Sequence, residues 1–262
     1  MDIRSSAPPA EHGAPVPDRA DFGPYTLGDA EPVVVSSADL DDPKTLQILS
    51  TEHWSLLASR SMTWNESFSR TGLFLSVLSA SVVALGLVGG ATQFSSAFAI
   101  FALVLLPVTL FVGVATYVRL DEANLEDTMW VAGMNRIRNA YVRIRPSVEP
   151  FLITGWTDDL EGVGRTFLMQ RTPTRANTLV HQFVTTPGMV AVVDGVLAGA
   201  IAGIVASSLS TGMAMTIPIG VIVAVATTAI LFMTSVRRGR RVMSAWHPRF
   251  PMPPDGGPPG PG

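Results

Sequence analysis

Four stretches of apolar residues dominate the pattern along the chain, at 71–91, 97–118, 187–208 and 213–234. A helix that crosses the hydrocarbon core of a bilayer needs about 20 such residues. The stretch at 187–208 contains one charged residue, Asp194, and the others contain none. Helices on a soluble core would instead carry polar residues at helical spacing. The pattern therefore predicts an all-α integral membrane protein with four transmembrane helices in two hairpins.

Amphipathic helices are predicted on either side of the first hairpin, before residue 71 and after residue 118, so that 44–146 reads as helix, two spans, helix. Stripes of mostly apolar residues recur there at spacings of three and four: Trp54, Leu57, Ser61, Trp64 and Phe68 in the first, and Trp130, Met134, Ile137, Tyr141 and Ile144 in the second. We expect these two stripes to pack against each other rather than against an external partner. Pro146 ends the second helix.

The basic residues all fall on one side of the predicted membrane. Of the 18 Lys and Arg, five precede the first span, eight lie in 119–186, five follow the fourth span, and the turns at 92–96 and 209–212 have none. Because positive charge stays on the cytoplasmic side, both termini and the central loop, 147–186, are expected in the cytoplasm. Lys44 is the single lysine, and this arginine bias is typical of a high-GC bacterial gene. The expected location is a bacterial cytoplasmic membrane.

The two ends of the chain differ in composition from the spans. Residues 1–43 carry nine acids and are rich in Pro, Ala and Gly, and 248–262 is a Pro/Gly segment. Neither can bury enough apolar surface to offset its ordering entropy. We expect a disordered acidic tail over 1–43 and, over 237–262, a basic segment beside the membrane followed by a disordered tail.

The third span carries the most informative polar residue, Asp194. Gly195, Gly199 and Gly203 recur every fourth position beside it and create a face of small residues that allows close approach of another helix, either the fourth span or a span of another subunit. Thr186 and Pro187 are predicted to cap and start this helix, which places Asp194 about 10 Å from its cytoplasmic end. Asp194 either lines a proton or ion pathway or helps to hold helices together, and the second interpretation is slightly favoured.

Other candidate features have a structural and a functional interpretation. Pro107 predicts a kink in the second span. Arg237, Arg238, Arg240 and Arg241 follow the fourth span and are expected to contact anionic lipid rather than nucleic acid. Asp121, Glu122, Glu126 and Asp127 follow the second span and are expected to form a solvated helix face, with a divalent-cation site as the less favoured alternative. Asp158 and Glu161 predict the capped start of a short helix that continues through Leu168.

Residues for enzyme chemistry are scarce. The chain has no cysteine, its one lysine lies outside any phosphate-binding loop, and its four histidines, His12, His53, His181 and His247, are scattered. No serine follows a nucleophile-elbow pattern. We therefore predict no catalytic residue, no metal site and no cofactor.

The order helix, two spans, helix over 44–146 resembles in outline the two-span effector modules found beside bacterial nucleotide-signalling defence systems, which are thought to act as membrane-disrupting pores. The second pair of spans departs from that outline, and no site residue is carried over from the resemblance. The expected function is a non-enzymatic membrane anchor or sensor/effector module that associates with itself or with a membrane-protein partner. The alternative is a small ion or proton channel or transporter that uses Asp194.

Overall fold

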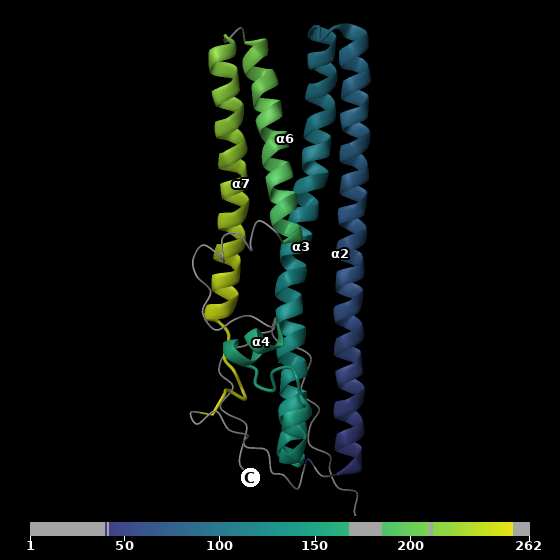
Figure 1. The fold of residues 1–262 in the computed structure, drawn as a ribbon, viewed down its shortest axis with the longest axis vertical. Coiled ribbons are helices and arrows are strands. Elements are labelled where there is room, and N and C mark those ends of the chain that lie inside the picture. Colours follow the sequence, from purple (N-terminus) through teal and green to yellow (C-terminus); the bar gives the residue numbers. More distant parts are fainter. Residues whose placement is uncertain (1–39, 41, 168–184, 210–211, 254–262) are drawn as a thin grey trace, which may run out of the picture.

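The computed structural model describes residue 40 and the ranges 42–167, 185–209 and 212–253, and Figure 1 shows their arrangement. In chain order, the elements are α2 (Pro43–Thr92), α3 (Ser96–Ile144), the 3-10 helix η2 (Pro146–Phe151), α4 (Leu160–Thr166), α6 (Thr186–Ser208) and α7 (Met213–Ser244). The described residues form helices and connecting segments without a strand. The prediction of an all-α fold is confirmed.

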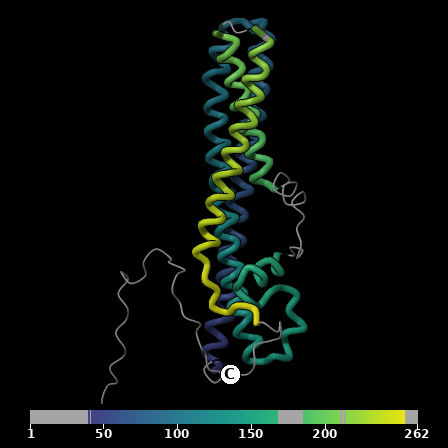
Figure 2. The backbone as a smooth tube through the Cα atoms, turned by 90° about the vertical axis from the view of Figure 1, so that its left-hand side faces the viewer, coloured from purple at the N-terminus to yellow at the C-terminus, as the bar shows by residue number. Residues whose placement is uncertain are grey.

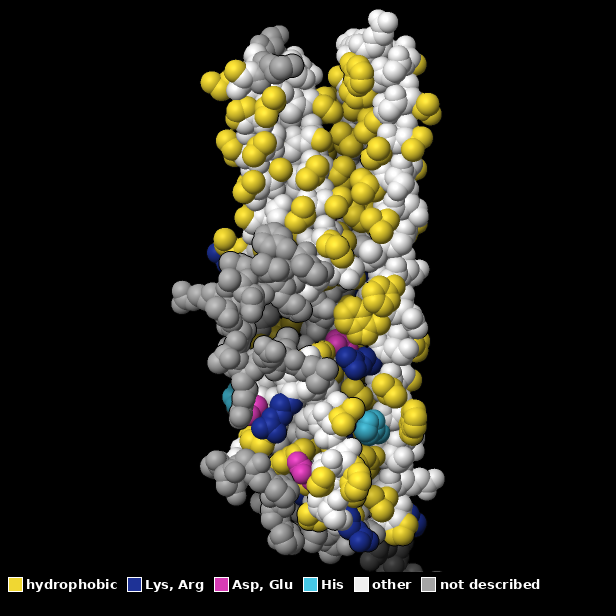
Figure 3. Space-filling view, in the orientation of Figure 1, with side chains coloured by type: hydrophobic (Ala, Val, Ile, Leu, Met, Phe, Trp, Pro, Cys, Tyr) yellow, Lys and Arg dark blue, Asp and Glu magenta, His cyan; other side chains and the backbone are white. Residues whose placement is uncertain are grey.

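The helices α2, α3, α6 and α7 are each long and apolar enough to cross a membrane. On the face drawn in Figure 3, hydrophobic side chains cover the upper part, and charged side chains and histidines gather in the lower part. The four expected spans lie inside these helices. The chain is therefore a membrane protein whose spans share one end of the molecule.

Two of the helices, α2 with 50 residues and α3 with 49, are more than twice as long as the roughly 20 residues that a bilayer requires. The amphipathic helices expected next to the first two spans extend those spans, so that each span and its flanking helix form one continuous helix. In α2, helical structure runs without interruption through the junction. The Thr71 hydroxyl donates a hydrogen bond there to the carbonyl of Ser67 at 2.8 Å. The α2–α3 hairpin is thus a continuous rod from the spans to the polar end.

A tight turn joins α2 to α3 at the apolar end of the rod. Gln93 and Phe94 have φ of 50° and 56°, a left-handed conformation that is uncommon for residues with a Cβ atom. The N–H of Phe94 donates to the carbonyl of Gly89 at 3.1 Å. Its ring covers Gly89 so closely that a Cβ atom there would lie 2.7 Å from the Phe94 ring. Gly89 therefore permits the turn.

The four long helices lie in the order α7, α6, α3, α2 across Figure 1, and the view in Figure 2 shows them overlapping in depth. Packing pairs are α2 with α3, α3 with α6, and α6 with α7. The buried cluster inside the spans consists of Phe74, Ala102, Leu106, Tyr117, Leu120, Val190, Ala191 and Leu197. The two hairpins are thus joined through α3 and α6.

Two helix starts lie one residue away from their predicted positions. Thr185, not Thr186, caps α6, because the Thr185 hydroxyl accepts the N–H of Gly188 at 3.3 Å. Asp159, not Asp158, caps α4, accepting the N–H of Gly162 at 2.8 Å. The α4 helix ends at Thr166 rather than continuing through Phe167, and Leu168 lies outside the described residues.

The predicted mutual packing of the two stripes is largely wrong for α2. Trp54, Leu57 and Phe68 are exposed by 69%, 41% and 57%. Trp64 of the stripe does face α3, and it and Arg60, which lay outside the stripe, both donate hydrogen bonds to Asp127 of α3. Charge pairing rather than the aromatic spacing sets the rotation of α2 at this end.

Part of the segment expected to be a tail is folded. The chain continues past α7 to residue 253, and its backbone at 249–252 is hydrogen-bonded to Asp158 and Asp159. The expected boundary of the tail at 248 is corrected accordingly, because these two carboxylates supply acceptors that composition alone does not reveal. Residues 254–262 and almost all of 1–43 lie outside the described residues.

Candidate functional site

Asp194 lies inside the spans, fully buried on the side of α6 that faces α3. Its carboxyl group points at Gly113 of α3, where a Cβ atom would lie 1.8 Å from Asp194 Oδ1 and 2.8 Å from the ring of Phe74 of α2. Neither carboxyl oxygen has a hydrogen-bond partner among the described residues. An ionised carboxylate without a partner is costly in such surroundings. Three helices therefore enclose a single acid that needs a proton, a cation or water beside it.

The glycine face of α6 packs on α7 rather than on α3. A Cβ atom at Gly195 would lie 2.0 Å from the Thr228 hydroxyl oxygen, and one at Gly199 would lie 2.5 Å from the carbonyl oxygen of Gly220. The same atom at Gly203 would lie 4.0 Å from the Thr216 methyl group, an ordinary contact. Of the two partners considered for this face, the described structure places the fourth span there.

Two threonines of α7, Thr216 and Thr228, donate hydrogen bonds to backbone carbonyls rather than to Asp194. Thr228 donates to the carbonyls of Ala224 at 2.9 Å and Ala191 at 3.4 Å, and Thr216 donates to the carbonyl of Gly212 at 3.4 Å. Asp194 thus faces α3 and α2, whereas its glycine neighbours face α7.

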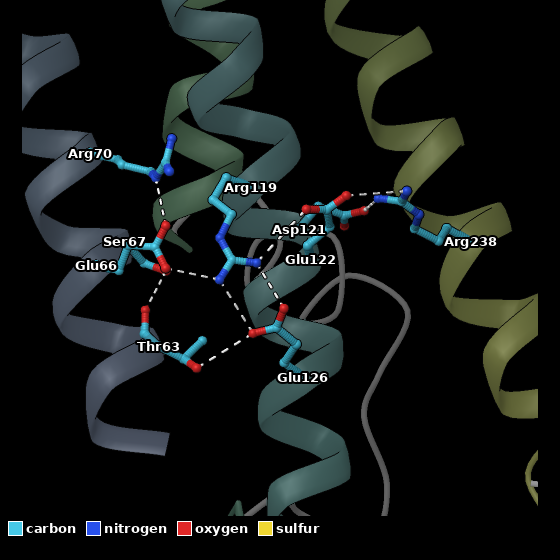
Figure 4. A network of polar contacts seen from close by, with 9 residues as sticks. All are labelled: Thr63, Glu66, Ser67, Arg70, Arg119, Asp121, Glu122, Glu126 and Arg238. Atoms are coloured by element: carbon cyan, nitrogen blue, oxygen red, sulfur yellow. Dashed lines mark hydrogen bonds and ion pairs between the residues drawn. The ribbon is translucent and has the colours of Figure 1, made fainter. Parts of the chain in front are cut away.

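A belt of charged residues surrounds α3 directly below the spans, as Figure 4 shows. Arg119 donates to Glu126 at 2.8 Å and to Glu66 of α2 at 3.1 Å. The hydrogen bonds with Glu126 and then Glu66 raise the pKa of Arg119, and the hydrogen bond from Arg119 lowers the pKa of Glu66. This part of the belt ties α2 to α3.

The remaining acids of the belt point to different neighbours. Asp127 is buried and accepts from Arg60 and from the indole N–H of Trp64. Asp121 accepts from the hydroxyl of Ser235 and lies 3.6 Å from Arg238 of α7. Asp121 and Asp127 are buried, while Glu122 and Glu126 are partly exposed and share Arg119, so the four acids do not form the single solvated face that we expected. They do not converge on a shared cation position either.

A second polar centre lies farther from the membrane, around Asp158. Its buried carboxylate accepts from Arg136 at 2.7 Å and from the backbone N–H groups of Arg249 and Phe250 at 3.0 and 2.8 Å. Trp246 donates its indole N–H to the Asp158 carbonyl at 2.9 Å. We call residues 246–252 the C-terminal latch, because they hold the extension of α7 on α3.

The latch is strengthened by stacking on α3 and by a second carboxylate. The guanidinium of Arg136 lies 5.8 Å from the Trp246 ring, and that of Arg143 lies 5.2 Å from the Phe250 ring. Asp159 accepts the N–H of Met252 at 2.8 Å while also capping α4. The latch, α4 and α3 therefore form one polar head. It lies at the end of the molecule that the sequence predicts to be cytoplasmic.

The other predicted site residues, except Arg238, lie apart from these centres. Pro107 lies inside α3, which continues as one helix on both sides of it. Arg237, Arg238, Arg240 and Arg241 all lie on α7 below its apolar part and are exposed. Of these, Arg238 reaches across to α3.

Sequence reasoning missed Gly113 and the role of Asp158. Gly113 is the single glycine in the apolar stretch 97–118, and a lone glycine in a helix interior is a recognised signal for close approach. Asp158 carried no comparable signal, because its partners Arg136 and 249–250 are distant in sequence. The pairing could not be deduced from local spacing.

No protein-family model, curated protein or solved structure matches this chain. The fold itself defines its class, an all-α membrane protein with four helices able to span a bilayer.

Proposed function

We propose that this chain is a non-enzymatic sensor/effector module of a bacterial cytoplasmic membrane, in which a cytoplasmic head is mechanically coupled to the spans. The observation that carries the proposal is the C-terminal latch. It ties the extension of the fourth span to α3 through the buried carboxylate of Asp158. A change in the head therefore acts on α3 and α7 together.

The coupling continues from the head into the membrane. From its latched end, α7 runs along α6, with Gly199 against Gly220. In turn, α6 carries Asp194 against Gly113 of α3. A displacement of the latch would thus reach the point where α2, α3 and α6 meet. A multi-pass anchor that transmits no signal would not need contacts that run from the latch through α7 and α6 back to α3.

Removal of the latch carboxylate tests the coupling. Asp158→Ala leaves the N–H groups of Arg249 and Phe250 and the guanidinium of Arg136 without their acceptor. In the full chain in lipid nanodiscs, hydrogen–deuterium exchange should accelerate at 246–252. It should also accelerate in the first turns of α6, from residue 186 to residue 199.

Glu52→Gln is the matched control, because Glu52 is an exposed carboxylate on α2 far from the latch in sequence. It should leave exchange in α6 unchanged. If Asp158→Ala accelerates exchange only at the latch and α4, head and spans are not coupled and the proposal fails.

The proposed module associates through its spans with a second copy or with another membrane protein. Supporting this, α2 exposes Leu73, Val82 and Leu87 by 61–71%, and among the long helices it packs chiefly on α3. Light scattering of the detergent-solubilised full chain measures self-association. A uniform monomer that also captures no membrane protein on crosslinking in cells would contradict this part.

A second candidate function, a small proton or ion pathway, is favoured by one observation: the fully buried Asp194 without a described hydrogen-bond partner. Asp194→Asn keeps the size of the side chain and removes its titratable group. If Asp194 conducts, proton flux into vesicles reconstituted with the full chain should fall to the background of empty vesicles. Flux that is equal in both proteins, or absent in the native one, would remove this candidate.

A further inference from the structure

A basic groove lies between α3 and α7 at the level where the spans end. Its volume is about 520 Å³, and its lining residues are Tyr117, Val118, Asp121, Thr234, Arg237, Arg238 and Arg241. Val118 and Thr234 are the last residues of the apolar stretches 97–118 and 213–234. The groove therefore opens at the boundary between hydrocarbon and water, where phospholipid headgroups lie.

The arginines of the groove differ in how they are engaged. Arg238 lies 3.6 Å from Asp121 and 3.5 Å from Glu122 and is 46% exposed. Within the described ranges, Arg237 and Arg241 form no ion pair. The lining thus holds three guanidinium groups and one carboxylate, that of Asp121, so a net positive charge remains after Arg238 has paired with Asp121. Such a site is complementary to a single phosphodiester.

The surface above the groove is apolar and exposed. Ile230 and Met233 are 60% and 50% exposed, and they precede Arg237 by seven and four residues, which places all three on the same face of α7. A phosphate held in the groove would therefore have acyl chains running along α7 above it. A soluble phosphate compound would use only the lower half of this surface.

We propose that the groove between α3 and α7 binds the phosphate-bearing headgroup of an anionic phospholipid through Arg237, Arg238 and Arg241. The bound phosphate competes with Asp121 and Glu122 for Arg238 and so bears on the contact between the second and fourth spans. Arg240 belongs to the same basic cluster and lies outside the groove lining. The proposal requires only that the groove lies at the membrane boundary, and it is independent of the sensor and channel proposals.

Binding is measured with the detergent-solubilised full chain and a short-chain phosphatidylglycerol, with phosphatidylcholine of equal chain length as the neutral lipid. Arg237→Gln and Arg241→Gln should each weaken phosphatidylglycerol binding about fivefold, since an arginine near an anionic lipid surface contributes about that factor. Phosphatidylcholine should bind more weakly, and its binding should change little in these variants.

Arg240→Gln is the matched control, because it removes the same charge from the same turn of α7 and should change phosphatidylglycerol binding less than twofold. Equal weakening by Arg240→Gln and Arg241→Gln would show diffuse attraction and overturn the groove. Glycerol 3-phosphate that binds as tightly as the lipid would show a soluble-phosphate site instead. Arg237 and Arg241 lack ion pairs in the described structure, so these two variants should keep the native unfolding temperature.

Discussion

At the residue scale, Asp194 and Gly113 form a close contact between the two hairpins. Gly113→Ala would place a Cβ atom 1.8 Å from Asp194 Oδ1 and 2.8 Å from the Phe74 ring. Neither neighbour has free space, so we expect a loss of about 1–3 kcal/mol in the free energy of unfolding. Thermal unfolding of the solubilised full chain, followed by circular dichroism, measures it.

Gly86→Ala supplies the control for that measurement. Gly86 lies in the apolar part of α2, and a Cβ atom there would have nothing within 4 Å. The unfolding temperature of the Gly86→Ala variant should match that of the native chain. Equal unfolding temperatures for the Gly113→Ala and Gly86→Ala variants would show that α3 and α6 do not meet at Gly113.

His53 makes the polar end of the α2–α3 rod sensitive to pH. Its ring stacks on Tyr141 with centroids 6.0 Å apart, and burial, with a smaller contribution from Arg138, lowers the pKa of His53 from 6.5. The unfolded chain therefore takes up the proton first as the pH falls. Stability that is full above about pH 6.5 should decrease as the pH falls from there toward the lowered pKa.

Comparison of unfolding temperatures at about pH 7.5 and about pH 5.5 reveals this contribution. The decrease should be smaller in the His53→Gln variant, whose side chain cannot titrate. An identical decrease in the His53→Gln variant and the native chain would rule out His53 as the source.

At the scale of elements, two of the three glycines on α6, Gly199 and Gly203, differ in how closely α7 approaches them. A Cβ atom at Gly199 would lie 2.5 Å from the Gly220 carbonyl oxygen and 2.9 Å from the Ala224 Cβ atom, whereas one at Gly203 has 4.0 Å to its nearest neighbour. Gly199→Ala should therefore cost about 1–3 kcal/mol by forcing the helices apart.

Gly203→Ala lies one turn farther along the same face and should change the free energy of unfolding by less than about 0.5 kcal/mol. Unfolding of both variants in a denaturing detergent titration gives the comparison. A larger loss for Gly203→Ala than for Gly199→Ala would contradict the packing described for this hairpin.

The existence of the four long helices was predictable because each apolar stretch meets a length requirement set by the bilayer. The rotation of α2 was not. Of the aromatic residues in the predicted stripe, Trp54 and Phe68 are exposed. Trp64 does face α3, where it and Arg60, which lay outside the stripe, reach Asp127, sixty residues or more away. Periodicity locates a helix, and only a long-range partner decides which side of it is buried.

At the scale of the whole molecule, the packing of the two hairpins against each other depends on long-range contacts that sequence patterns do not reveal. Asp194 was identified from the sequence as the residue to examine, but its neighbour Gly113 lies on a different span. The latch joins residues that are about ninety positions apart in the chain. Local patterns therefore gave the elements and one candidate residue, and the contacts between hairpins came from the structure.

The threading of the chain through the membrane is a prediction for the whole molecule, and the absence of cysteine from the sequence makes it directly testable. Gly212 and Gly239 lie on either side of the apolar part of α7, and a Cβ atom at either would have nothing within 4 Å, so both should accept cysteine without distortion.

In right-side-out spheroplasts, a membrane-impermeant maleimide should label the Gly212→Cys variant and leave the Gly239→Cys variant unlabelled. After lysis, both should react. This outcome follows from the basic residues, which flank Gly239 at Arg238 and Arg240 and are absent from the turn before Gly212. Labelling of the Gly239→Cys variant alone in intact spheroplasts would reverse the orientation and place the latch and its head outside the cell.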